Sequence, residues 1–382
     1  MGIYLDYNAS SPIDIRVLDY MVDIYKNHIG NADSRTHTFG DDTRSIVENA
    51  RQEVADLLGV KKDEIFFTSG STESNNIAIL GLKKYGMQSN KRHIITTSIE
   101  HKAVLGAASS LIEEGFEVDF VHPDDTGRIS VEDLISKIRP DTLLVSVMHV
   151  NNETGIIQPV KEIGAFLEDK GIYFHIDATQ SAGKLVDEVR ELQYDMLSIS
   201  AHKMHGPQGI GALVLKKKKY KLPPINPVMY GGQQEHGIRP GTLPVALIGG
   251  FGKACKYATD EYRERTRICA DIKDKLMILV CNSGLIYHIN GDPRYCVPTT
   301  LNISFIGVSS EALMLATKQF CGISNGSACN SSSYSHSHVL SAMQLSEERI
   351  DSALRISWDS DVNVEMMIDE FKNLLETVHA FQ

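Results

Sequence analysis

Short apolar runs alternate with longer segments of helical spacing through the first two thirds of the chain. The short runs predict strands over residues 65–68, 93–99, 142–150, 173–176, 196–199 and 211–215. The segments between them predict helices up to about residue 84, from about 102 to 114, and over 160–170. Strands that alternate with helices form a mainly parallel sheet covered on both faces. Ligands of such sheets bind beyond the carboxyl ends of the strands, so we expect the functional residues there.

The pattern changes after about Phe251. The elements predicted there are a charge-rich helix over 253–280, a strand over 301–305, a helix over 311–319 and a final helix from about residue 364. They indicate a smaller α+β domain. We therefore predict an α/β fold with a large domain over residues 15–250 and a small domain formed by residues 1–14 and 251–382. No low-complexity linker separates the two, so we expect extensive contact between them.

The composition is that of an ordinary globular protein. The chain has 382 residues, of which 42% are hydrophobic and 23% charged, enough for a sizeable core. A net charge of −11 argues against tracking along nucleic-acid phosphates, and the basic run Lys216–Lys219 is more typical of a solvated turn than of a docking surface. No apolar stretch approaches the roughly 20 residues that span a bilayer. No signal peptide is visible, so we predict a cytoplasmic protein without nucleic-acid or membrane contacts.

Polar residues of particular types follow five of the predicted strands. They are Ser71 and Thr72, then His101, then Asn152, then Asp177 and Gln180, and finally Ser200, His202 and Lys203. A Gly-Ser-Thr turn that opens a helix is suited to a phosphate, although helix capping alone would explain it. A single histidine is usually structural, but here its ring could stack on a flat cofactor. Together the five strand ends indicate one binding site.

Lys203 and Asp177 suggest which cofactor that site holds. Lys203 falls at the end of a predicted buried strand, where desolvation would favour the neutral amine that attacks carbonyl groups. An acid and a lysine on neighbouring strand ends are what pyridoxal phosphate (PLP) needs, because it requires a carbonyl trap and a partner for its pyridinium nitrogen. A lysine that merely extends its side chain to solvent remains the alternative.

Cys329 stands apart from the other cysteines. The six cysteines show no CxxC pair and no zinc-like spacing, so we predict free thiols and no metal site. Cys329 lies in the small and polar stretch 322–333, which buries too little apolar area to be rigid. An exposed thiol could act as a nucleophile if its pKa were lowered or if His336 or His338 served as a base. An inert surface loop is the other reading.

Arg355 lies within an apolar, strand-like run. A buried arginine needs a carboxylate partner, and its planar fork is suited to binding an amino-acid carboxylate at two points. An internal salt bridge would explain the same residue, and the sequence alone leaves both possibilities open.

Taken together, these residues closely resemble the cysteine desulfurases, PLP enzymes of fold type I (aspartate-aminotransferase-like). The resemblance covers nearly the whole chain. The matching motifs are Tyr4–Tyr7, Thr68–Asn75, Glu100-His101, His149–Gly155, His175–Ala178, Ser200–Lys203, Arg239–Pro244, Gly326–Cys329 and Arg355. The Gly-Ser-Ala-Cys form of the cysteine segment is similar to the long-loop class, which includes the iron–sulfur-assembly enzymes.

The resemblance implies a role for each residue. Lys203 would bind PLP covalently, and His101 would stack on its ring and move protons. Cys329 would accept the sulfur of L-cysteine as a persulfide, leaving L-alanine, and a protein acceptor would then receive that sulfur. The other implied cofactor contacts are Asp177 to the pyridinium nitrogen, Gln180 to the ring hydroxyl, and Ser71, Thr72, Ser200 and His202 to the phosphate. Asn152 and Arg355 would bind the substrate carboxylate, and Thr242 would reach the phosphate from the partner subunit of a homodimer.

The pathway is less constrained by the resemblance. The chain ends at Gln382 soon after its last predicted helix, whereas housekeeping relatives carry a further tail that docks the iron–sulfur scaffold. Residues 30–37, 92–105 and 139–147, together with Trp358, look more like the desulfurases of bacterial DNA phosphorothioation systems. Sulfur supply for iron–sulfur clusters or tRNA thiolation, another PLP reaction such as selenocysteine lysis, and a non-catalytic scaffold are the alternatives.

Overall fold

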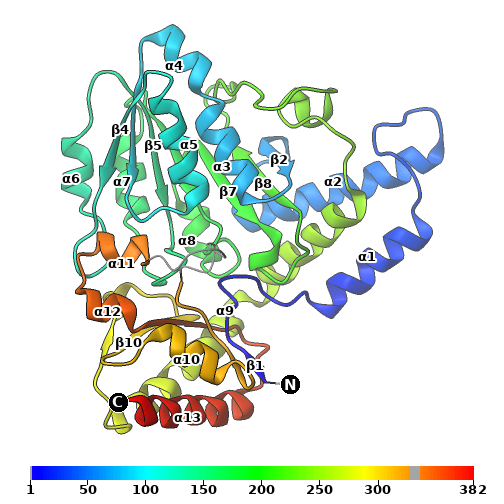
Figure 1. Ribbon diagram of the computed structural model, residues 1–382. Helices are drawn as coiled ribbons and strands as arrows, with labels where there is room; N and C mark the ends of the chain where they lie inside the picture. Colours follow the sequence, from blue (N-terminus) through cyan, green and yellow to red (C-terminus); the bar gives the residue numbers. More distant parts are fainter. Residues whose placement is uncertain (1, 327–335) are drawn as a thin grey trace.

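Two units organise the chain in the computed structural model, which describes residues 2–326 and 336–382. The larger core and a separate cluster that includes Phe66 and Leu213 pack on a seven-stranded sheet, and we call this part the large unit. The smaller core surrounds a three-stranded sheet, and we call this part the small unit (Figure 1). The helices of the large unit are α1 (Ile15–Asn27), α2 (Thr38–Leu58), α3 (Ser71–Leu80), α4 (Lys83–Ser89), α5 (Lys102–Ile112), α6 (Val131–Ser136), α7 (Val160–Leu167) and α8 (Val186–Glu191).

The seven-stranded sheet has the order β2-β8-β7-β6-β5-β3-β4. Its strands are β2 (Ile65–Thr68), β3 (His93–Thr97), β4 (Glu117–Val121), β5 (Thr142–Met148), β6 (Tyr173–Asp177), β7 (Met196–Ser200) and β8 (Gly211–Leu215). Within this sheet only β8 runs antiparallel to its neighbours. The other strands are parallel, so the carboxyl ends of β2, β3, β5, β6 and β7 share one edge. The predicted mainly parallel α/β architecture is confirmed.

The small unit is built on the order β12-β10-β9, with β9 (Tyr287–Ile289), β10 (Thr300–Phe305) and β12 (Ala353–Ser357). The helices α10 (Ser310–Thr317) and α13 (Val364–Phe381) pack on it, and β1 (Ile3–Tyr4) pairs with β11 (Cys321–Gly322). The short helices α11 (His338–Ala342) and α12 (Glu347–Asp351) instead contribute Leu340 and Ile350 to the larger core. The chain therefore crosses between the two cores after residue 336, and the predicted domain limits stay a prediction.

The helix α9 (Val245–Asn282) connects the two units (Figure 1) and begins earlier than the sequence predicts. Its first turns contain Gly249, Gly250 and Gly252, which disfavour a helix by intrinsic propensity. Packing reverses that preference, since a β-carbon on Gly252 would lie 2.6 Å from Cα of Ala50 on α2. The glycines thus allow α9 to approach α2 closely, and the tertiary contact outweighs the local cost.

Two other differences from the predicted elements are instructive. The single helix predicted up to about residue 84 is divided into α3 and α4, and the carbonyl of Gly81 at the break accepts a hydrogen bond from the amide of Asn226, 2.9 Å away. The strand β4 was not predicted, because its residues Glu117–Val121 lie at the sheet edge and are only partly buried. Edge strands carry a weaker apolar signal than central ones.

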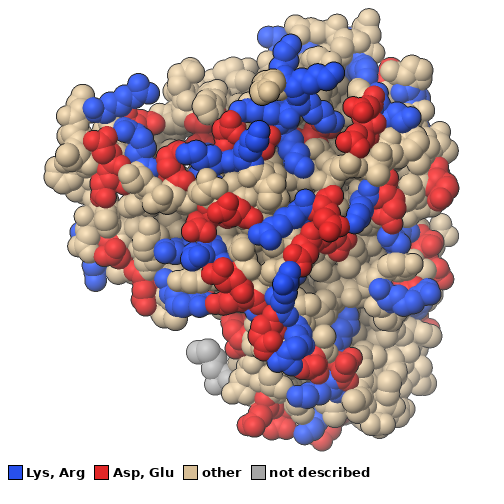
Figure 2. Space-filling model, turned by 180° about the vertical axis from the view of Figure 1, so that it is seen from behind, with Lys and Arg blue, Asp and Glu red and all other residues tan. Residues whose placement is uncertain are grey.

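The charged surface has no continuous basic face in the view of Figure 2, where acidic and basic side chains are interspersed over most of the area. Within the run Lys216–Lys219, Lys217 pairs with Asp63 and Lys218 lies 2.8 Å from Asp195. Among the described residues, none of the helices is long and apolar enough to span a membrane.

Candidate active site

A cavity of about 360 Å³ opens at the carboxyl edge of the seven-stranded sheet. Nine of the predicted site residues line it: Ser71, Thr72, His101, Asn152, Asp177, Gln180, His202, Lys203 and Arg355. Eight come from the large unit and Arg355 comes from the small unit. Asn8, Ala9, Met148, Val150, Thr179 and Gly326 complete the lining. The strand ends that the sequence indicated therefore do meet in one place.

Lys203 ends the single turn η2 (Ala201–Lys203) that follows β7. Its Nζ donates hydrogen bonds to the backbone carbonyl oxygens of Asn8, at 2.5 Å, and Ala9, at 2.6 Å. The amino-terminal segment therefore forms one wall of the site and holds the lysine amine in the cavity. This contact could not be predicted from the sequence.

Asp177 ends β6 and is only 5% exposed. Its Oδ2 accepts a hydrogen bond of 2.7 Å from Nδ2 of Asn75 on α3, and its Oδ1 accepts one of 3.0 Å from the amide of Thr179. These donors fix the orientation of the carboxylate. Asn75 and Thr179 were not among the predicted site residues. Asn75 lies one helical turn after Ser71, and this spacing is the feature of the sequence from which its place in the site could have been predicted.

His101 caps the amino terminus of α5. Its Nδ1 accepts a hydrogen bond of 3.1 Å from the amide of Ala103, so in the neutral ring the proton resides on Nε2. Burial lowers the pKa of His101, an effect opposed by the nearby Asp177 and reinforced by Lys203. The ring is therefore a neutral group at physiological pH with a defined donor nitrogen.

The phosphate-binding residues predicted from the sequence gather at the amino terminus of α3. Gly70 precedes the helix with φ +151°, a conformation that favours glycine, and no side chain caps the first helical N–H groups. Ser200 is buried, and its Oγ lies 3.7 Å from where a β-carbon of Gly70 would stand. Burial lowers the pKa of His202 to about 4, so its ring is neutral at pH 7.

The cavity also offers unpaired polar atoms to a ligand. Oε1 of Gln180 and Oδ1 of Asn152 are buried without a hydrogen-bond partner, a condition that costs free energy unless a ligand or water satisfies it. PLP has a phosphate, a pyridinium nitrogen and a ring hydroxyl. These groups are matched, in that order, by the open N–H groups at the helix terminus, the aspartate carboxylate and the free amide oxygen. The donor set therefore fits that cofactor.

Arg355 forms the internal salt bridge that was one of the two possibilities left open by the sequence. Its guanidinium lies 2.6 Å from Oδ1 of Asp6 and donates to the carbonyl oxygen of Asn152 at 3.0 Å. Its Nε is buried without a partner, although the side chain lines the cavity. The internal salt bridge is real, and it holds the arginine where one further acceptor could bind.

Three predicted residues are absent from the cavity lining that the described residues form: Ser200, which is buried behind it, Thr242 and Cys329. Thr242 is exposed and lies outside the cavity lining of this chain. Cys329 falls outside the described residues, whereas Gly326, three positions earlier, lines the cavity. His338 donates from Nε2 to the carbonyl oxygen of Glu100 at 3.0 Å, and His336 lies 3.7 Å from Asp351.

The fold and this cavity are those of a PLP enzyme of fold type I, and the chain belongs to the aminotransferase class-V family, which it matches over residues 3–361. It is 44% identical to the mitochondrial cysteine desulfurase of Arthroderma benhamiae over 92% of this chain and 70% of that protein. Among solved structures, DndA of Streptomyces lividans is 43% identical with a TM-score of 0.81, covering 92% of this chain and 98% of that one. SspA in complex with cysteine is 35% identical, also with a TM-score of 0.81, covering 93% and 98%. The predicted family, fold type and PLP cofactor are confirmed.

Proposed function

We propose that the protein is a PLP-dependent cysteine desulfurase that converts L-cysteine to L-alanine and stores the released sulfur as a persulfide on Cys329. The observation that carries this proposal is the convergence of Lys203, Asp177 and His101 in one cavity with Arg355 from the other unit. The cysteine ligand named for SspA and the cysteine desulfurase name of the Arthroderma protein support the choice of substrate.

Different residues of the cavity would hold the cofactor and the substrate. Ser71, Thr72, Ser200 and His202 would bind the phosphate of PLP, and the ionised Asp177 would keep its ring nitrogen protonated. When bound, the cofactor supplies an electron sink for the negative charge left on the α-carbon of the amino acid. Asn152 and Arg355 would hold the substrate carboxylate. That orientation directs the α-proton toward the bases of the site.

His101 and Lys203 are the proton carriers in this scheme. Because Nδ1 of His101 is occupied by an amide donor, exchange with the substrate falls to Nε2. The amine of Lys203 lies on the same cavity wall as Asn8 and would accept the α-proton of the substrate.

In this proposal Cys329 removes the sulfur atom from the substrate. Its thiolate would attack the substrate sulfur, so that an S–S bond forms as the substrate C–S bond breaks. The electron pair of that bond remains on the substrate carbon, which is protonated to give alanine. No oxidant is required, because the carbon is reduced as the sulfur is oxidised. A sulfur-acceptor protein would then remove the terminal sulfur.

Intact mass spectrometry tests this proposal directly. The PLP-loaded protein is exposed briefly to L-cysteine, and the expected gain is one sulfur atom, absent in Cys329→Ala. Cys281→Ala is the matched control, since Cys281 is an exposed thiol distant from the cavity lining. Alanine formation without sulfur on Cys329, or sulfur on the Cys329→Ala variant, would overturn the assignment. Conversion of a different amino acid alone would favour another PLP reaction, such as selenocysteine lysis.

The sulfur acceptor defines the pathway that the enzyme serves. We propose that this pathway is DNA phosphorothioation. The sequence resemblance to desulfurases of such systems is matched by the similarity to DndA. Supply of sulfur for iron–sulfur clusters or tRNA thiolation is the alternative. Transfer of ³⁵S from the loaded enzyme to purified candidate acceptors separates the two.

We also propose a homodimer in which Thr242, exposed in the single chain, reaches the partner's phosphate site. Sedimentation of the wild type and a Thr242→Ala cofactor titration test this.

A further inference from the structure

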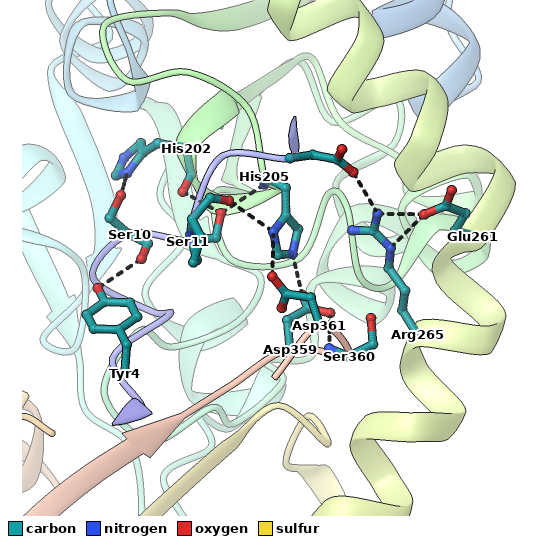
Figure 3. Close-up of polar contacts among 12 residues, drawn as sticks. Tyr4, Ser10, Ser11, His202, His205, Glu261, Arg265, Asp359, Ser360 and Asp361 are labelled. Carbon is teal, nitrogen blue, oxygen red and sulfur yellow. Dashed lines mark hydrogen bonds and ion pairs between the residues drawn. The ribbon is translucent and has the colours of Figure 1, made fainter. Parts of the chain in front are cut away.

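His205 lies two residues beyond Lys203 but outside the cavity lining. Its backbone is left-handed, with φ +61°, which non-glycine residues adopt rarely. The His205 amide donates to Oγ of Ser11 at 2.8 Å, and its Nδ1 lies 3.1 Å from the carbonyl oxygen of Pro12. These contacts hold the ring at the junction of the two units, as Figure 3 shows.

Asp359 of the small unit lies on the other side of this ring. Its Oδ2 is 3.1 Å from Nε2 of His205, and Oδ2 of Asp361 is 3.8 Å from Nδ1 (Figure 3). The ring and Asp359 are both buried, with 5% and 7% exposed. Both ring nitrogens face oxygen atoms, and the contact is a buried histidine–carboxylate pair that joins the units.

The surroundings of Asp359 keep its carboxylate ionised. Burial raises the pKa of Asp359, but the hydrogen bond and charge of His205, the amide of Ser360 and the charge of Lys184 together hold that pKa well below its usual range. Lys184 belongs to the large unit, so its positive charge also faces this carboxylate of the small unit. Removing the His205 ring would leave a buried carboxylate without its partner.

The strand β12 connects this pair to the cavity. Arg355 lies on β12 four residues before Asp359, and Ser357 between them accepts a hydrogen bond of 2.9 Å on its Oγ from the amide of Asn8. The carbonyl oxygen of Asn8 in turn accepts from Lys203. The pair therefore completes a closed series of contacts. This series joins the turn that contains Lys203 to β12, the strand that contains Arg355.

Buried polar pairs add little net stability, but they can select one geometry over others. We infer that His205 and Asp359 form a positioning pair that fixes β12, and with it Arg355, against the Lys203 turn, so that the substrate carboxylate is bound at the correct distance. The inference rests on the proposed function, because the carboxylate is that of the amino-acid substrate. Neither residue lines the cavity, so both act through Arg355.

The test uses Asp359→Asn and the double variant His205→Asn/Asp359→Asn in the PLP-loaded protein. The double variant removes the imidazole and the carboxylate together, which separates positioning from the cost of leaving one partner buried alone. Glu188→Gln is the matched control, because His149 and Glu188 form a histidine–carboxylate pair of the same 3.1 Å that lies wholly within the large unit. Steady-state kinetics with L-cysteine give KM and kcat. Hydrogen–deuterium exchange of the β12 amides provides a readout that is independent of activity.

We expect KM to rise at least fivefold in both Asp359 variants, with kcat within twofold of the wild type and faster exchange in β12. The control should change none of these. A KM within twofold of the wild type in both variants, or an equal rise in the control, would overturn the inference. If the wild type does not convert L-cysteine, the proposed function fails, and unchanged β12 exchange in the variants would then overturn the positioning pair separately.

Discussion

The Nζ of Lys203 lies 2.5 Å from the carbonyl oxygen of Asn8, although 195 residues separate the two along the chain. Asn8 also donates from its amide to Ser357 and from Nδ2 to Thr300 at 2.9 Å, both in the small unit. One residue of the amino-terminal segment therefore contacts the proposed cofactor lysine and two strands of the other unit. The site depends on three distant parts of the chain.

Lys203 is expected to be the lysine that carries PLP. Reduction of the loaded protein with borohydride should fix the cofactor on the peptide that contains Lys203. Lys203→Ala should lower the rate of alanine formation by roughly 10³-fold or more, because a covalent residue is lost. Lys161→Ala, which changes an exposed lysine paired with Glu191, should leave the rate unchanged. Cofactor found on another lysine would contradict the site assignment.

Asn75 should matter because it orients Asp177. Asn75→Ala removes the 2.7 Å hydrogen bond to Oδ2 of Asp177, and a hydrogen bond to a charged group contributes about 1.5–3 kcal/mol. We expect PLP affinity, measured by fluorescence titration, to fall by about tenfold or more. Asn76→Ala is the control on the same helix, since the side-chain amide of Asn76 donates to the backbone carbonyl oxygen of Thr72 and not to Asp177. Equal losses in the two variants would argue against a specific role for Asn75.

The close packing of α2 and α9 predicts opposite effects for two glycine substitutions. Gly252→Ala would place a methyl group 2.6 Å from Cα of Ala50, and such overpacking should destabilise the fold by about 1–3 kcal/mol. Gly106→Ala lies on α5 with nothing within 4 Å of the new methyl group. It should stabilise the protein by about 0.5–1 kcal/mol through helix propensity. Urea denaturation measures both, and destabilisation by Gly106→Ala would refute this account.

His175 should make stability depend on pH. Its ring is fully buried between Oγ of Ser146 and Oγ of Ser198, at 2.8 and 2.9 Å, and burial lowers its pKa to about 4. The unfolded state, with a histidine pKa near ~6.5, binds the proton first. The free energy of unfolding should therefore fall as pH drops from about 6.5 to about 4, by about 3 kcal/mol from this residue.

The pH effect is measured by urea denaturation of the wild type and His175→Gln across that window. The variant should lose less stability on acidification than the wild type does. His288→Gln, at an exposed position on β9, should follow the wild type. Parallel pH curves for all three proteins would show that His175 does not titrate in this way.

The features that depend on local order could be predicted from the amino-acid sequence. Strand ends can be located from apolar runs, and in a parallel sheet those ends meet, so His101, Asp177 and Lys203 could be assigned to one cavity before any contact was known. The motifs around them were specific enough to indicate the PLP-dependent family. Thr242 and Cys329 were also proposed from those motifs, and their roles stay predictions.

The contacts between segments that are distant in sequence became known from the folded chain. The Asn8 carbonyl under Lys203, the Asn75 amide on Asp177 and the His205–Asp359 pair carry no periodic signal, because each depends on how two packed units meet. The early start of α9 was decided in the same way: local propensity disfavours its glycines, whereas close packing on α2 requires them. Local pattern therefore located the reactive groups, and packing fixed their partners, because packing energies sum over contacts that the chain order does not reveal.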